Sequence, residues 1–259
     1  MNNRVFAIVA HPDDIEFMMA GTLILLRSAG YEIHYLTVAN GSCGSMQHDP
    51  ATIADIRRAE ALASAALIDA TYHESLCDDL EIFYERSTLR RLASIMRQVA
   101  PEIVLTHPPQ DYMEDHMNTC RLVLSAAFAR GVPNYPVEPP QPPVNNPVTI
   151  YHAMPYGLHD PLRQAVQAEM YVDIGDVIAT KRLMLAQHRS QKDWLDASQG
   201  IDSYLSHMET LSRAMGQLSG RFEFAEGWTR HLPLGYCAED ADPLRTALAD
   251  RVISRITHK

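Results

Sequence analysis

The first half of the chain alternates short apolar runs with segments of helical periodicity. The run 5–10 is rich in β-branched residues and has the length of a strand that is buried on both faces. From residue 15 to residue 26 the apolar positions recur at helical spacing. Asp13 or Asp14 can cap the start of this helix, and Gly30 can close its end. The first unit is therefore predicted to be a strand followed by a helix.

The same alternation continues to about residue 130. We expect strands at 33–38, 70–72 and 103–106. Helices are expected from Thr52, at 87–99 and at 115–130. The T-x-x-D that begins at Thr52 resembles a capping box. Alternating strands and helices imply right-handed crossovers and a mostly parallel sheet with helices on both faces. The predicted fold class is α/β, with a Rossmann-like layer.

A proline-rich segment separates this layer from the rest of the chain. Residues 133–147 hold seven prolines, so we interpret the segment as an extended spacer loop rather than a peptide-docking motif. Beyond it we expect strands at 148–153 and 170–174, and helices at 176–188, 202–218 and 243–255. We predict one domain over 1–259: a Rossmann-like core (1–132), the proline-rich loop (133–147) and a C-terminal part with helical additions that completes the site (148–259).

Composition excludes several classes of protein. The 22 Lys and Arg residues are scattered among 32 Asp and Glu, giving a formal charge of −10, which argues against a nucleic-acid surface. No apolar run approaches 18 residues, so we expect no membrane span. The four cysteines form no C-x-x-C pair, which favours a reduced, cytoplasmic setting. The sequence leaves open whether copies of the chain form a homo-oligomer.

Polar side chains follow two of the predicted strands directly. His11-Pro-Asp-Asp14 follows the first strand, and a segment from His107 to His116 follows the strand at 103–106. Ligands of open α/β sheets bind at the carboxyl ends of strands, so both segments would face one crevice if these strands are neighbours. No G-x-G-x-x-G follows the first strand, which argues against dinucleotide binding. Imidazoles and a carboxylate from distant segments form a ligand set for a divalent ion, and this mixture suits zinc with an open position for water.

Four motifs of the chain match one family. The motif at 10–14 resembles the AHPDD signature of the PIG-L/LmbE-like zinc-dependent N-deacetylases. The other three resemble that family's D-x-x-x-DH motif (Asp111 to His116), its R-x-x-E helix (Arg57 to Glu60) and its K…H-x-SQ stretch (Lys181 to Gln191). The resemblance spans roughly residues 4–195.

The resemblance implies a metal centre and a reaction. It implies one zinc ion per chain, held by His11, Asp14 and His116, and a general base, Asp13, that does not bind the metal. It also implies a Rossmann-like fold and hydrolysis of an N-acetyl group on a small, N-acetylglucosamine-type or other amino-sugar substrate. Zinc would activate a water molecule and polarise the acetyl carbonyl, while Asp13 accepts the proton of the water.

Further residues are candidates for supporting roles. Arg57 is a candidate for contact with the substrate. Asp79 lies where the family often has a substrate-contacting aspartate, although the sequence alone does not separate it from Asp78. Asp111 and Asp115 are candidates for orienting the metal-binding imidazoles from outside, or for simple carboxylates at a helix N-terminus.

The chain departs from the family at one position. Many members read H-P-D-H in the second motif, and their first histidine steadies the oxyanion or donates a proton, whereas this chain has Met113 there. A thioether cannot donate a proton or a hydrogen bond. Tyr112, His231 and His107 are possible replacements, and His231 ranks first because it lies in a late loop that could fold over the crevice.

Two other functions stay open at this point. Met113 allows a non-catalytic metal- or sugar-binding homologue with a degraded site. Two histidines and one carboxylate also describe the facial triad of non-haem iron oxygenases, although the adjacent Asp13 argues against that reading.

Overall fold

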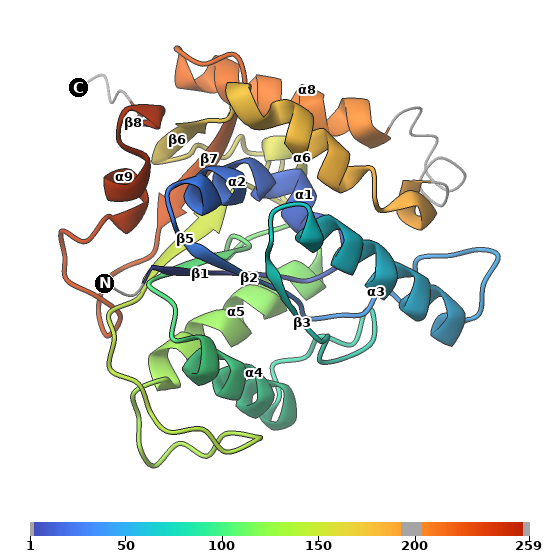
Figure 1. Ribbon diagram of the computed structural model, residues 1–259, viewed down its shortest axis with the longest axis vertical. Helices are drawn as coiled ribbons and strands as arrows, with labels where there is room; N and C mark the ends of the chain where they lie inside the picture. Colours follow the sequence, from blue (N-terminus) through green and yellow to red (C-terminus); the bar gives the residue numbers. More distant parts are fainter. Residues whose placement is uncertain (1–2, 193–203, 256–259) are drawn as a thin grey trace.

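A computed structural model of the chain describes residues 3–192 and 204–255. Its centre is an eight-stranded sheet with the strand order β3-β2-β1-β4-β5-β7-β6-β8 (Figure 1). In chain order the strands are β1 (Arg4–Val9), β2 (Glu32–Thr37), β3 (Thr71–His73), β4 (Ile103–Thr106), β5 (Thr149–Ala153), β6 (Met170–Asp173), β7 (Ala225–Arg230) and β8 (Val252–Ser254). The first five are parallel to one another, whereas β7 pairs antiparallel with both β5 and β6, and β6 pairs antiparallel with β8.

Helices cover both faces of the sheet, as Figure 1 shows. The helices are α1 (Asp14–Met18), α2 (Ala20–Ser28), α3 (Pro50–Ala66), α4 (Arg86–Val99), α5 (Glu114–Ala129), α6 (Ile178–Leu185), α8 (Tyr204–Ser219) and α9 (Pro243–Leu248), with short 3-10 turns η1 (Tyr156–Leu158), η2 (Gly175–Val177) and η3 (Ala249–Arg251). Helices α4 and α5 lie on one face, and α1, α2, α6 and α8 lie on the other. Among the described helices, none has the length and apolar character that a membrane crossing requires.

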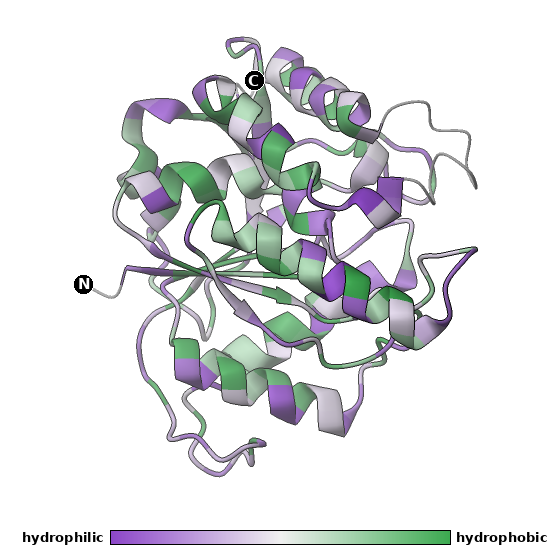
Figure 2. Cartoon of the chain, turned by 45° about the vertical axis from the view of Figure 1, so that its right-hand side comes forward, coloured by the Kyte–Doolittle hydropathy of each residue, from purple (hydrophilic) through white to green (hydrophobic). Residues whose placement is uncertain are grey.

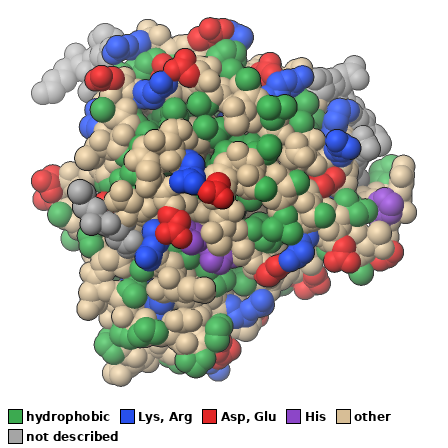
Figure 3. Space-filling model, in the orientation of Figure 1, with side chains coloured by type: hydrophobic (Ala, Val, Ile, Leu, Met, Phe, Trp, Pro, Cys, Tyr) green, Lys and Arg blue, Asp and Glu red, His purple; other side chains and the backbone are tan. Residues whose placement is uncertain are grey.

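The alternation of side chains along β1 explains the two layers. Val5 and Ala7 pack with Leu23 and Leu26 of α2 on one face. Phe6 faces the opposite way and packs with α4 and α5. Both faces of the strand are therefore apolar, and Figure 2 shows hydrophobic ribbon through the centre of the sheet. On the surface drawn in Figure 3, acidic and basic side chains are interspersed.

The predicted fold class is confirmed, and most predicted elements lie within a few residues of their observed bounds. Three predictions are wrong. Helix α3 is capped by Asp49, whose carboxylate accepts a hydrogen bond from the Thr52 amide, so Thr52 is not the cap. The segment 243–255 is a short helix followed by strand β8. The single helix expected from residue 15 is broken at Met19, where the backbone leaves the helical region.

A buried carboxylate explains the break at Met19. The side chain of Glu226, on β7, accepts hydrogen bonds from the amides of Gly21 (2.8 Å) and Thr22 (2.7 Å) at the start of α2. It also accepts one from Lys181 Nζ at 2.7 Å, and both charged side chains are buried. A new helix start exposes the free amides that such a carboxylate needs. The break therefore fastens α2 to the antiparallel half of the sheet.

Candidate active site

Two of the candidate metal ligands lie at the junction of β1 and α1. His11 follows the end of β1, and Asp14 is the first residue of α1. The carboxylate of Asp14 accepts a hydrogen bond from the His11 amide at 2.8 Å, which closes the turn. Asp14 Oδ2 lies 3.5 Å from His11 Nδ1, so that imidazole nitrogen and the carboxylate oxygen face each other.

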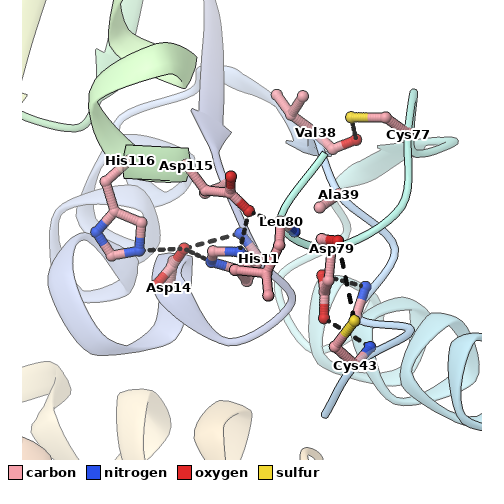
Figure 4. A network of polar contacts seen from close by, with 12 residues as sticks. His11, Asp14, Val38, Ala39, Cys43, Cys77, Asp79, Leu80, Asp115 and His116 are labelled. Atoms are coloured by element: carbon pink, nitrogen blue, oxygen red, sulfur yellow. Dashed lines mark hydrogen bonds and ion pairs between the residues drawn. The ribbon is translucent and has the colours of Figure 1, made fainter. Parts of the chain in front are cut away.

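The third candidate ligand comes from a segment about a hundred residues later. Strand β4 pairs with β1, and α5 then presents His116 from its first turn. His116 Nε2 lies 3.5 Å from Asp14 Oδ2, and the three ligand atoms all lie within 4.8 Å of one another. Ligand atoms of a tetrahedral zinc site, bound at 2.0–2.1 Å, are about 3.3 Å apart. The spacing of His11, Asp14 and His116 therefore fits one metal ion (Figure 4).

Each imidazole has a carboxylate on its outer side. His11 Nε2 lies 3.0 Å from Asp115 Oδ2, and His116 Nδ1 lies 3.0 Å from Asp111 Oδ1. Metal-binding histidines usually have such a partner, which fixes the ring and its tautomer. Asp111 and Asp115 thus occupy the positions that the orienting role requires, and Figure 4 shows Asp115 beside His11.

The electrostatics of this cluster suit a cation. Although burial lowers the pKa of His11, hydrogen bonds to Asp115 and Asp14 raise it to about 10. Burial also raises the pKa of Asp14, but the nearby imidazoles of His116, His107 and His11 hold it well below its usual value. The cluster therefore holds a positive charge strongly, and a metal ion can take the place of the proton.

A second group of ligating residues fits a metal less well. His107, Asp111 and His116 also offer ligand atoms close together. However, His107 Nε2 already accepts a hydrogen bond from the Ala10 amide at 2.9 Å, and Asp111 is fully buried. Neither residue lines the cavity described below. We therefore place the metal at the first group.

Asp13 lies beside the candidate ligands but points elsewhere. Its backbone is in the left-handed region, with φ of 99°, which is unusual for a residue other than glycine. Burial raises the pKa of Asp13 to about 6, although the Arg57 guanidinium lowers it. The distorted turn separates two consecutive carboxylates, so that Asp14 faces the histidines while Asp13 faces Arg57 at 3.6 Å.

A cavity of about 340 Å³ opens over this cluster. His11, Asp13, Asp14 and His116 form its floor. One part of its wall is apolar or aromatic and consists of Phe17, Met18, Leu80, Tyr112, Met113 and Tyr156. The other part is polar and consists of Cys43, Gly44, Arg57, Asp79 and Gln191. The cavity therefore suits a ligand with both an apolar face and hydrogen-bonding groups.

The loop after β2 builds the polar wall. Asp79 accepts hydrogen bonds from the amides of Gly41 (2.9 Å) and Cys43 (3.0 Å), and it lies 3.9 Å from Arg57. A Cβ at Gly41 or Gly44 would come within 2.6 Å of the Arg57 side chain, so this loop requires glycine. Asp78 is instead exposed and accepts a hydrogen bond from the Asn40 side chain. Of the two aspartates that the sequence alone does not tell apart, Asp79 lines the cavity and Asp78 does not.

The candidates to replace the family histidine are placed differently. Tyr112 lines the cavity, and its ring packs edge-on against His116 at 5.5 Å. Burial raises the pKa of Tyr112, as do the carboxylates of Asp14 and Asp111, so its hydroxyl keeps its proton. His231 does not line the cavity; its Nδ1 lies 3.0 Å from His152 Nε2. The structure does not bring His231 to the site because the strand pairing that follows β7 aligns its backbone with Ile150.

Three further site residues had no role assigned from the sequence. Tyr156 and Phe17 line the cavity but have no motif around them. Gln191 also lines it, and its membership of the H-x-SQ stretch was an available signal. His188, in the same stretch, is buried with its Nε2 3.3 Å from Glu16, and it does not line the cavity.

The fold and the site together define an α/β protein with a His-Asp-His group able to hold a metal ion at the carboxyl ends of β1 and β4. Comparison with known proteins agrees. The family model PIG-L, described as GlcNAc-PI de-N-acetylase, matches residues 6–127. Over these residues the chain is therefore similar to the PIG-L/LmbE-like family.

Known relatives of the chain have two different activities. It is 27% identical over 236 residues to a diacetylchitobiose deacetylase of Thermococcus kodakarensis, covering 86% of this chain and 81% of that protein. It is 30% identical over 156 residues to a 4-oxalmesaconate hydratase of Pseudomonas putida, covering 52% of this chain and 60% of that protein. In structure it resembles an N,N'-diacetylchitobiose deacetylase from Pyrococcus horikoshii, with a TM-score of 0.75, 24% identity, and coverage of 93% of this chain and 88% of the other.

Proposed function

We propose that the protein is a zinc-dependent amide hydrolase that removes an N-acetyl group from an amino-sugar conjugate. The observation that carries this proposal is the arrangement of His11, Asp14 and His116 around one point on the cavity floor, with the carboxylate of Asp13 beside them. The deacetylase activities named for the family and for two relatives support it.

The residues of the site can divide the work of hydrolysis. A zinc ion held by His11, Asp14 and His116 would lower the pKa of water and polarise the acetyl carbonyl. Asp13 is placed to accept the proton of the attacking water and to pass it to the departing amine, which gives acetate and a free amino group. The protonated hydroxyl of Tyr112 is the candidate donor to the oxyanion that forms during attack. Arg57 and Asp79 are candidates for binding the sugar.

The charge of the cavity favours one of the two activities of the relatives. Among its described lining residues, three carboxylates (Asp13, Asp14 and Asp79) outweigh the single guanidinium of Arg57. This net charge of −2 would be brought to zero by a divalent ion. A cavity without excess positive charge suits a neutral acetylated sugar better than oxalmesaconate, which is a polycarboxylate. The charge balance therefore favours deacetylation over hydration.

The test combines metal analysis with two activity assays. Purified protein should contain about one zinc per chain and release acetate from at least one member of a panel of N-acetylglucosamine, diacetylchitobiose and N-acetylglucosaminyl conjugates. Hydration of 4-oxalmesaconate is followed separately by absorbance. Hydration without acetate release would replace the proposal with the hydratase function. Full zinc occupancy with neither activity would favour a non-catalytic binding protein, and bound iron with a 2-oxo acid requirement would favour an oxygenase.

A further inference from the structure

A tyrosine from the C-terminal part of the chain reaches the predicted general base. Tyr204 is the first residue of α8, and its hydroxyl donates a short hydrogen bond to Asp13 Oδ2. The two residues are 191 positions apart. Tyr204 also lies outside residues 6–127, which the family model matches. The contact therefore joins the Rossmann-like core to a part of the chain that carries no recognised motif.

Both oxygens of the Asp13 carboxylate have a neighbour. Oδ2 accepts the hydrogen bond from Tyr204, and Oδ1 lies 3.6 Å from Nη2 of Arg57. The hydrogen-bond donor comes from α8, and the partner in the ion pair comes from α3. The orientation of the carboxylate is thus held from two directions, in addition to the constraint from its left-handed backbone.

Packing fixes the position of the Tyr204 hydroxyl. The side chain is 1% exposed and belongs to a cluster with Leu185 and Met208. Its ring packs edge-on against Phe17 with centroids 5.0 Å apart. A phenol ring held this way has little freedom to follow a moving partner, so its hydroxyl is a fixed point. A buried hydroxyl also needs a hydrogen-bond partner, and Asp13 supplies it.

We propose that Tyr204 is the positioning residue for Asp13: its hydroxyl fixes Oδ2 and thereby aims the carboxylate at the water molecule that it deprotonates. This inference rests on the proposed function, because it assigns Tyr204 a part in the proton transfer. A misaligned base loses rate even when substrate and metal bind normally. Tyr204 would therefore affect kcat more than KM.

The first test is Tyr204→Phe, which keeps the ring and removes one hydroxyl. We expect kcat to fall about 10- to 100-fold, the range for losing a hydrogen bond to a charged group, with KM and zinc content within about twofold. The matched control is Tyr151→Phe. Tyr151 is equally buried and donates to a carboxylate, that of Asp242 at 2.8 Å, but Asp242, unlike Asp13, does not line the cavity. This control should lower stability and leave kcat unchanged.

A double variant separates positioning from a structural role. In the Asp13→Asn background, Tyr204→Phe should have almost no further effect on kcat, because both changes remove the same function. The proposal is wrong if the loss of kcat in the double variant equals the product of the two single losses. It is also wrong if Tyr204→Phe alone has the kcat of the wild type.

A measurement without turnover tests the hydrogen bond itself. In metal-free protein labelled with 13C at the tyrosine Cζ, the Tyr204 resonance is assigned by its absence in Tyr204→Phe. The chemical shift of this resonance should change in Asp13→Asn. It should be the same as in the wild type in Asp78→Asn, because Asp78 does not line the cavity. An unmoved resonance in Asp13→Asn would overturn the proposal. If the wild type releases no acetate, the proposed function fails, while this spectrum still decides whether Tyr204 donates to Asp13.

Discussion

Two consecutive aspartates have different surroundings in this site. Asp14 faces three imidazoles, whereas Asp13 faces Tyr204 and Arg57. The turn between β1 and α1 produces this difference, since Asp13 adopts a left-handed backbone immediately before the helix. Neighbouring residues of the same type can therefore have separate chemical roles.

Substitution at the two aspartates should separate metal binding from catalysis. Asp14→Ala should lose zinc, because three protein ligands leave little redundancy. Asp13→Asn should keep zinc and its fold, since asparagine tolerates left-handed backbone, but should lose on the order of 10²–10⁴ in turnover. Zinc titration with a competing chelator and acetate release measure the two effects. Equal loss of zinc in both variants would contradict the division of roles.

The substitute for the family histidine can be tested at Tyr112. Tyr112→Phe should lower kcat by about 10²–10³ with KM little changed, as expected for a donor to the transition state. His231→Ala should have little effect, because His231 does not line the cavity. Met113→His should rescue Tyr112→Phe if both side chains serve the same step. Steady-state kinetics of the three variants test this. A large loss of kcat in His231→Ala with little loss in Tyr112→Phe would instead identify His231 as the donor.

At the scale of elements, a buried ion pair joins the two halves of the sheet. Glu226 on β7 accepts hydrogen bonds from the start of α2 and from Lys181 on α6. Helix α2 is thereby held against the antiparallel strands, and α1, directly before it, begins with the candidate metal ligand Asp14. The antiparallel strands thus support the site without contributing a ligand among the described residues.

Glu226→Gln should destabilise the protein strongly. It leaves the Lys181 ammonium buried without its counter-charge, which costs about 3–5 kcal/mol of unfolding free energy. Adding Lys181→Met should recover part of this loss, because the uncompensated charge is then gone. Urea unfolding measures both variants. Glu223→Gln breaks an exposed ion pair with Arg213 and serves as the control, with little expected effect. A loss for Glu226→Gln no larger than that of the control would contradict the role of the pair.

At the scale of the whole molecule, the sequence predicts the parallel half better than the antiparallel half. The strands β1 and β4 are continuous apolar runs because they are buried on both faces. Strand β7 contains Glu226 and Gly227, so no apolar run marks it, and β8 has three residues. The break at Met19 depends on Glu226, more than two hundred residues away, and no local pattern encodes it.

The site divides in the same way. His11, Asp14 and His116 belong to compact motifs next to strand ends, so the sequence brings them out directly. Tyr204 is one aromatic residue in an amphipathic helix, and its contact with Asp13 depends on how α8 packs. The prediction of His231 rested on a loop whose position is set by strand pairing rather than by the motif.

The overall stability should decrease in mild acid because of a histidine pair on β2 and β3. His34 Nδ1 lies 3.0 Å from His73 Nε2, and burial with the neighbouring His34 lowers the pKa of His73 to about 4. Below pH 6.5 the unfolded chain binds a proton at residue 73, whereas the folded chain binds this proton only near pH 4. This difference in pKa corresponds to about 3.4 kcal/mol in full, and because His73 is only half-buried, solvent screening reduces the expected fall in the free energy of unfolding to about 2 kcal/mol. Above this interval the stability should be fully retained.

Urea unfolding of metal-free protein between pH 4 and pH 7 checks this. His73→Gln should remove most of that part of the slope, whereas His48→Gln, at an exposed histidine, serves as the control. Identical slopes for wild type and His73→Gln would show that the pair does not contribute.

At position 13, the residue that would best stabilise the left-handed turn differs from the residue that the proposed reaction needs. Glycine would adopt this left-handed conformation without strain, so a chain optimised only for stability would favour glycine at position 13. Glycine has no carboxylate, however, so the relaxed chain would lose the proposed general base. Under the proposed function, the strained backbone at residue 13 costs stability but supplies the carboxylate that the reaction needs.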